Sequence, residues 1–113
     1  IAPDFDVFPS TEAALIEARG GAFAGCMSAT ANCNADLCAR AWRSGDTSAH
    51  EKAVAIRALF EGKPLVAGIK ALLAHIHGDP ALAAMKPPLA PPSAADKAAI
   101  LAGYDAVRAR KVA

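Results

Sequence analysis

The sequence lacks a long hydrophobic run and an excess of one charge, and both absences exclude classes of protein. No apolar stretch reaches the roughly 18 residues that a membrane-spanning helix needs, and no signal-peptide pattern opens the chain. The 12 basic residues stand against 11 acidic residues, so the chain has no basic field to attract nucleic acid. We therefore expect neither a membrane nor a nucleic-acid partner.

Cysteine is also scarce, and its spacing fits no zinc-binding pattern. Cys26, Cys33 and Cys38 are an odd number of thiols, and we expect them to be free thiols in a reducing cytoplasm. His75 and His77 are two residues apart on a predicted helix, so their side chains point in different directions and form no two-histidine site. The sequence predicts no metal and no cofactor.

The N-terminal part of the sequence predicts two strands joined by a helix. "FDVF" (Phe5–Phe8) is typical of a short strand, and Ala22–Met27 is an apolar run of strand length. A helix between them begins after Ser10 or Thr11 and ends at Gly20 and Gly21. This connection is too long for a hairpin and suits a parallel crossover, so we expect a βαβ unit.

The remainder predicts helices over residues 34–45, 48–62, 64–78 and 93–113. Ser48 with Glu51, and Ser93 with Asp96, form capping boxes. The prolines of residues 85–93 exclude both a helix and a central strand. The expected buried stripes are Ala49, Ala53, Ile56 and Phe60; Leu65, Val66, Ile69, Leu72, Leu73 and Ile76; and Ile100, Leu101, Tyr104 and Val107.

Two parallel strands are not a stable sheet by themselves, because parallel sheets need several neighbours and helices on both faces. The missing strands must come from copies of this chain or from a longer polypeptide. The chain begins at Ile1 rather than at Met, and we expect it to be part of a longer polypeptide.

Four segments appear in a characteristic order: "FDVFPSTEAAL", "GGAFAGCMSATANCNADL", "GKPLVAGIKALL" and "MKPPLAPPSAADKAAIL". Together they resemble the dihydrodipicolinate synthase / N-acetylneuraminate lyase family of pyruvate-dependent aldolases over essentially the whole chain. The resemblance implies an α/β fold, namely the C-terminal fragment of a (β/α)8 TIM barrel with its last two strands, plus a C-terminal helical bundle. Most residues would be helical. Residues 1–45 would be the last βαβα part of the barrel, and residues 46–113 the C-terminal helical region.

The resemblance also implies a chemistry. The full-length protein would be a lyase, a class I aldolase whose lysine forms a Schiff base with a 2-oxo acid such as pyruvate or its aldol adducts. That lysine and a proton-shuttling tyrosine lie on earlier strands in the family, so we expect this chain alone to be inactive. The family further implies a homodimer or homotetramer.

The expected substrate-binding residues lie after the two predicted strands. The resemblance assigns Ser10, Thr11 and Glu12 to the loop at the distal part of the substrate, and Met27 and Ala29 to the end of the last strand. Ser28 and Thr30 are added as hydroxyls at the same end. Ser10 and Thr11 replace the Gly-Asp pair that is common in the family, which leaves the substrate open.

Each of these residues also has a purely structural interpretation. Ser10 or Thr11 can cap the following helix, and the helix dipole favours Glu12 in the first turn. Ser28 and Thr30 can satisfy backbone groups where the strand ends, and we expect Asn32 to fix the turn into the next helix.

Two other functions remain open at this point. The same imine chemistry supports a dehydratase or a hydratase-aldolase. A function of a different class is a non-catalytic interaction module, in which the amphipathic helices form a small bundle without any barrel.

Overall fold

The computed structural model describes residues 4–111, and its regular structure in that range is entirely helical. In chain order the elements are η1 (Glu12–Ala14), α1 (Leu15–Arg19), α2 (Ala31–Ser44), α3 (Thr47–Ala58), α4 (Leu65–His77), η2 (Pro80–Ala83) and α5 (Ala94–Ala109). Residues 4–111 contain no strand. The predicted α/β class is therefore wrong, and the chain is not a barrel fragment with two strands.

The two predicted strands, Phe5–Phe8 and Ala22–Met27, are instead irregular segments that lie side by side. The backbone N–H of Ala24 donates to the Val7 carbonyl at 2.9 Å, and the N–H of Met27 donates to the Pro9 carbonyl at 3.0 Å. Both bonds run from the later segment to the earlier one. The N–H of Ala22 donates to the Glu17 carbonyl of α1 at 3.1 Å, but within residues 4–111 no strand lies beside either segment. Without such neighbours the pair does not become a parallel sheet.

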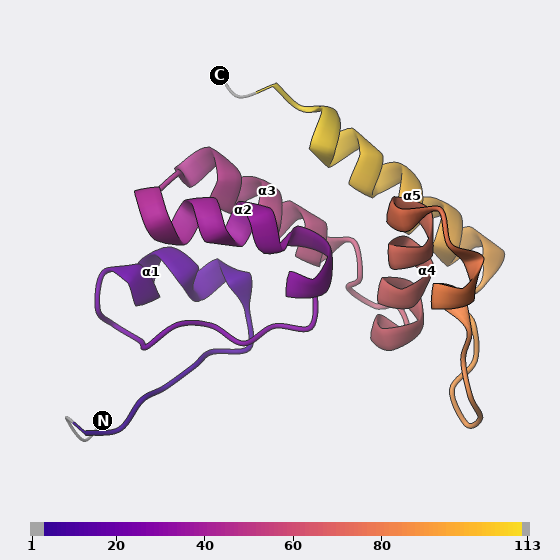
Figure 1. Cartoon of the computed structure of the whole chain (residues 1–113), viewed down its shortest axis with the longest axis horizontal. Coiled ribbons are helices and arrows are strands. Elements are labelled where there is room, and N and C mark those ends of the chain that lie inside the picture. Colours follow the sequence, from indigo (N-terminus) through magenta and orange to yellow (C-terminus); the bar gives the residue numbers. More distant parts are fainter. Residues whose placement is uncertain (1–3, 112–113) are drawn as a thin grey trace. The chain divides into compact units, whose positions relative to one another are not determined.

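The chain divides into two compact units, and the first ends at Val54. In this unit α1 packs beside α2 (Figure 1). Its buried apolar residues are Leu15, Ala18, Cys33, Leu37, Ala41, Ala49 and Ala53. The α2 helix ends at Gly45, whose φ of 69° lies in the left-handed region that favours glycine. The predicted end of this helix is confirmed.

The starts of α2 and α3 differ from the sequence-based expectation. The α2 helix begins at Ala31 rather than after a cap at Asn34, and Asn34 has non-helical angles (φ −139°, ψ 21°) that kink it. The α3 helix begins at Thr47, and Asp46 Oδ1 accepts the backbone N–H of Ala49 at 2.9 Å. Asp46 is thus the cap, in place of the predicted Ser48. Both Asp and Ser cap helices well, so two candidates that lie two residues apart compete.

The second unit begins at Ala55 and contains α4, η2 and α5. Figure 1 shows η2 beside α4, and α5 also packs on α4. Ile56, Leu72 and Ile100 are its fully buried large side chains. At Gly68 an added Cβ would lie 3.0 Å from Ile100 Cδ1 and 3.1 Å from Phe60 Cδ1, so glycine allows this close packing.

Most of the helix predictions in this unit are confirmed. Ser93 caps α5 by accepting the N–H of Asp96 at 3.1 Å, and α4 begins directly after Pro64. Residues 112–113 of the predicted last helix lie outside the described residues. Not all of the α4 stripe is buried, because Leu65, Val66 and Ile76 are exposed. No helix within residues 4–111 has the length and apolar character to span a membrane.

Candidate functional site

The candidate site lies where the chain enters η1 and where it enters α2. The bond from Met27 N–H to the Pro9 carbonyl places the loop before η1 against the loop before α2. Every residue that the sequence predicts to bind substrate belongs to one of these two loops or to the first residue of η1. The fold thus brings together two groups of residues that are well separated in the sequence.

Glu12 is the centre of this arrangement, and its side chain is completely buried. Ser28 Oγ donates to Glu12 Oε2 at 2.8 Å, and Thr30 Oγ1 donates to Glu12 Oε1. Asn34 Nδ2 donates to the same Oε1 at 3.1 Å. The two hydroxyl oxygens of Ser28 and Thr30 are 2.9 Å apart. Three donors from the start of α2 therefore surround one carboxylate from η1.

These donors decide the charge of Glu12. Burial raises the pKa of the Glu12 carboxyl, because a low dielectric disfavours the charged form. Hydrogen bonds from Thr30, from the Glu12 backbone and from Ser28 and Asn34 act in the opposite direction, and the net result is a pKa below the ordinary value. Glu12 is therefore a buried carboxylate ion at neutral pH, stabilised by these hydrogen bonds.

A second set of polar contacts, which the sequence did not predict, fixes the positions of Asn34 and of the Glu12 backbone. Asn34 Nδ2 also donates to the Ala53 carbonyl of α3 at 3.2 Å, and Asn34 Oδ1 accepts from Cys38 Sγ at 3.4 Å. His50 Nε2 lies 2.9 Å from the Glu12 carbonyl oxygen, and the tautomer protonated at Nε2 donates to it. One sequence signal existed: Asn34 shares the buried face of α2 with Leu37 and Ala41, where an apolar residue is expected.

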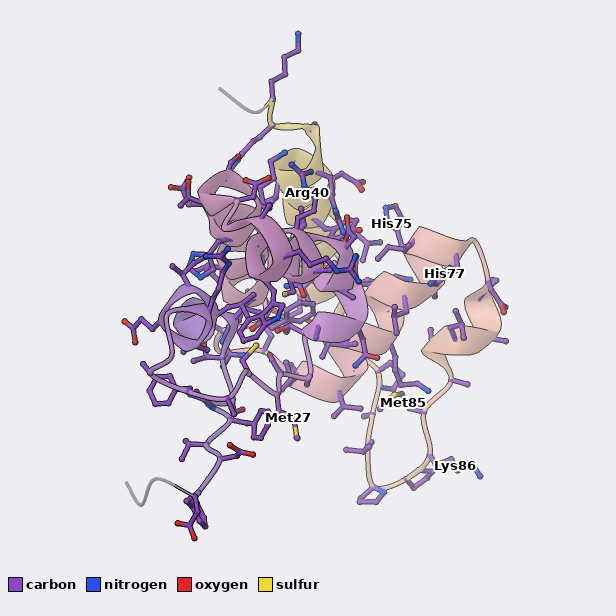
Figure 2. All side chains as sticks on the ribbon, turned by 60° about the vertical axis from the view of Figure 1, so that its left-hand side comes forward. Met27, Arg40, His75, His77, Met85 and Lys86 are labelled. Atoms are coloured by element: carbon purple, nitrogen blue, oxygen red, sulfur yellow. The ribbon has the colours of Figure 1, made fainter. Side chains whose placement is uncertain are left out.

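The structure separates the predicted residues into buried and accessible groups. Glu12 and Thr30 are fully buried, and Ser28 is half-buried. Ser10, Met27 and Ala29 are exposed, and Figure 2 shows the Met27 side chain projecting away from the ribbon. Their assignment to substrate binding stays a prediction.

Two of the structural interpretations are confirmed. Thr11 is the N-cap of η1, where its Oγ1 accepts the N–H of Ala13 at 3.2 Å. Asn32 Nδ2 donates to the Ala29 carbonyl at 2.8 Å and so fixes the turn into α2.

The geometry defines what the site can do. Both oxygens of Glu12 are engaged and buried, so this carboxylate holds two loops in register rather than contacting a ligand. Ser10 is exposed, and its hydroxyl can donate to an oxygen of a small carboxylic acid, whereas the hydroxyl proton of Ser28 is already donated to Glu12. Within residues 4–111 no group of three or more histidine, cysteine, aspartate and glutamate side chains is placed to hold a metal ion.

Comparison with protein-family models, with curated proteins and with solved structures finds no match to this chain.

Proposed function

We propose that this chain supplies part of the substrate site of a lyase that acts on a 2-oxo acid through a Schiff base. The imine-forming lysine would lie on a segment outside this chain. A protonated imine accepts the electron pair of the adjacent carbon–carbon bond, and this makes aldol cleavage or formation possible. The role of this chain would be to bind and orient the substrate.

The observation that carries the proposal is that Glu12 joins the loop before η1 to the loop before α2. Ser28 and Thr30 donate to the carboxylate of Glu12, and Met27 donates to the Pro9 carbonyl. The four resemblance-bearing segments assign substrate contacts to these same two loops. The buried carboxylate would fix the loops, while the exposed Ser10, Met27 and Ala29 would face the substrate.

Borohydride trapping tests this proposal on the natural polypeptide that contains the chain. Incubation with pyruvate and borohydride should attach one reduced pyruvate to one lysine, which peptide mass spectrometry locates. We expect that lysine to lie outside this chain, so Lys52, Lys63, Lys70, Lys86, Lys97 and Lys111 should stay unmodified. An adduct on one of these six lysines, or no adduct at all, would refute the proposal.

A substitution in this chain tests the substrate-orienting role. Ser10→Ala removes one exposed hydroxyl and should raise KM for the 2-oxo acid while the lysine still forms its adduct. Ser44→Ala is the matched control, because Ser44 Oγ only bonds the Arg40 carbonyl at the end of α2. Product analysis then separates carbon–carbon cleavage from the water loss of a dehydratase.

A second function is favoured by a specific observation, the absence of any strand in residues 4–111. Two compact helical units, each with its own buried residues, suit a non-catalytic interaction module. Circular dichroism, size-exclusion chromatography and urea unfolding of the isolated chain separate the two functions. A monomeric helical chain that unfolds cooperatively favours the module, and an aggregating or molten chain favours the lyase part.

A further inference from the structure

The second unit contains a hollow of about 390 Å³ between α4, η2 and the start of α5. Its lining is mostly small: Ala71 comes from α4, Pro80 and Ala83 come from η2, and Leu101 comes from α5. Short side chains where three helical segments meet leave space that larger residues would fill. The volume lies within the range of small-molecule sites in proteins, roughly 300–1,000 Å³.

Two nitrogen-bearing side chains, Lys97 and His75, belong to the same lining. On α5, Lys97, Leu101 and Asp105 follow one another at intervals of four, so they share one face of the helix. His75 Nε2 lies 3.1 Å from each carboxylate oxygen of Asp105. The hollow therefore has a lysine at one end, an apolar middle and a histidine anchored by aspartate at the other end.

The charges along this face favour an anion near Lys97. Lys97 is exposed and has no ion-pair partner among residues 4–111. Asp105 and Asp79 adjoin the lining and are engaged elsewhere, and Asp96 precedes Lys97 in the sequence without lining the hollow. Asp105 binds His75, and Asp79 Oδ1 accepts the backbone N–H of Ala81 at 3.0 Å. An anionic group beside an apolar body would complement both the lysine and the hollow.

We propose that this hollow binds a small monocarboxylic acid with an apolar aromatic or branched body. The carboxylate pairs with the Lys97 ammonium group, and the body lies against Leu101 and the alanines. The Asp105 contact fixes the ring of His75 through Nε2 and leaves Nδ1 for a polar group at the far end of the ligand. This site is separate from the loops around Glu12 and does not depend on the lyase proposal.

Nuclear magnetic resonance on the full chain tests the site with 3-phenylpropanoate as the probe. We expect Kd on the order of 1 mM for a ligand of this size. Shifts of backbone amide signals should concentrate at residues 71–83 and 97–101. The neutral analogue 3-phenylpropan-1-ol has the same apolar body and should bind about two- to fivefold more weakly, because it lacks the charge that pairs with lysine.

Matched lysine variants distinguish binding in this hollow from a general attraction of the acid to positive charge. Lys97→Met should weaken binding of 3-phenylpropanoate about two- to fivefold, and Lys97→Arg should largely restore it. Lys86→Met is the control, because Lys86 projects from the connector that follows η2 and does not line the hollow (Figure 2). Ala83→Leu, which fills the hollow without removing a charge, should also abolish the shifts.

Three results would overturn the proposal. They are equal binding of the acid and the alcohol, equal loss of binding in the Lys97→Met and Lys86→Met variants, and shifts spread over residues 4–54. The amide spectrum of each variant reports directly whether the variant is folded, so a failure to bind cannot be confused with unfolding.

Discussion

Glu12 and Thr30 are 18 residues apart in the sequence, and a fully buried hydrogen bond joins their side chains. Ser28 and Asn34 complete the set of donors to the same carboxylate. A buried ion of this kind is tolerated only while its donors are in place, because an unpaired charge in the interior costs several kcal/mol. Glu12 therefore joins the loops at the candidate site, together with the backbone hydrogen bond from Met27 to Pro9.

Removal of the Glu12 carboxylate should destabilise the chain. We expect Glu12→Ala to lower the free energy of unfolding by about 3 kcal/mol, because Thr30 and Asn34 lose their shared acceptor and a cavity forms. Glu12→Gln keeps one acceptor oxygen and should lose about half as much. Urea unfolding followed by circular dichroism measures both. Glu17→Ala, at an exposed position of α1, is the control and should change stability by less than about 0.5 kcal/mol. An equally small effect of Glu12→Ala would contradict the role assigned to Glu12.

Acid should remove the stabilisation that depends on the charge of Glu12. The pKa of Glu12 is lowered below the ordinary 4.5 in the folded chain, so the folded state binds fewer protons than the unfolded state in the window just below 4.5. The stabilisation is fully present above that window and is lost as pH falls through the folded pKa. The stability gap between the natural chain and Glu12→Gln should thus shrink from about pH 7 to about pH 3. A gap that is constant or widens with acid would show that Glu12 is not a stabilised anion.

Cys38 should resist alkylation in the folded chain. Burial first, and the charge of Glu12 second, raise the pKa of the Cys38 thiol to about 12. Only the thiolate reacts, so at about pH 8 iodoacetamide should modify Cys38 at least about 100-fold more slowly in the folded chain than in urea. Peptide mass spectrometry over time follows each cysteine separately. Rapid modification of Cys38 without urea would mean that its surroundings open readily.

The end of α2 should depend on glycine at position 45. Gly45 has a φ of 69°, and an added Cβ would meet Arg19 Nη1 at 3.4 Å, which is an ordinary contact. The penalty for Gly45→Ala is therefore conformational, and we expect a loss of about 1 kcal/mol in the free energy of unfolding. Gly45→Asn should lose less, because asparagine adopts this conformation more readily. Thermal unfolding of both variants measures the order, and a reversed order would place the cost in packing instead.

Local signals in the sequence predicted most of the helices, but they did not predict the tertiary contacts of the segments between the helices. Gly45 and Ser93 mark helix ends through their own backbone and side-chain preferences, and the structure confirms both. The strands predicted at Phe5–Phe8 and Ala22–Met27 failed because a strand exists only with partners, and the described residues supply a single pair of hydrogen bonds. The apolar composition of a segment does not show whether neighbouring strands are available to pair with it.

The candidate site was predictable in its residues but not in its chemistry. Glu12, Ser28 and Thr30 were singled out as polar groups near one another. Sequence analysis placed Glu12 towards a substrate, whereas the structure buries it completely. Asn34 was missed because an asparagine near a helix start is usually a cap, and only the long-range contacts with Glu12 and Ala53 show its other role.

The kink at Asn34 has a mechanical consequence. One amide group bonds the Glu12 carboxylate and the Ala53 carbonyl, so it connects the turn η1, the bend in α2 and the middle of α3, and His50 also connects α3 to the Glu12 carbonyl. These three places should exchange their amide hydrogens for deuterium as one cooperative group, since none can open without releasing the other two.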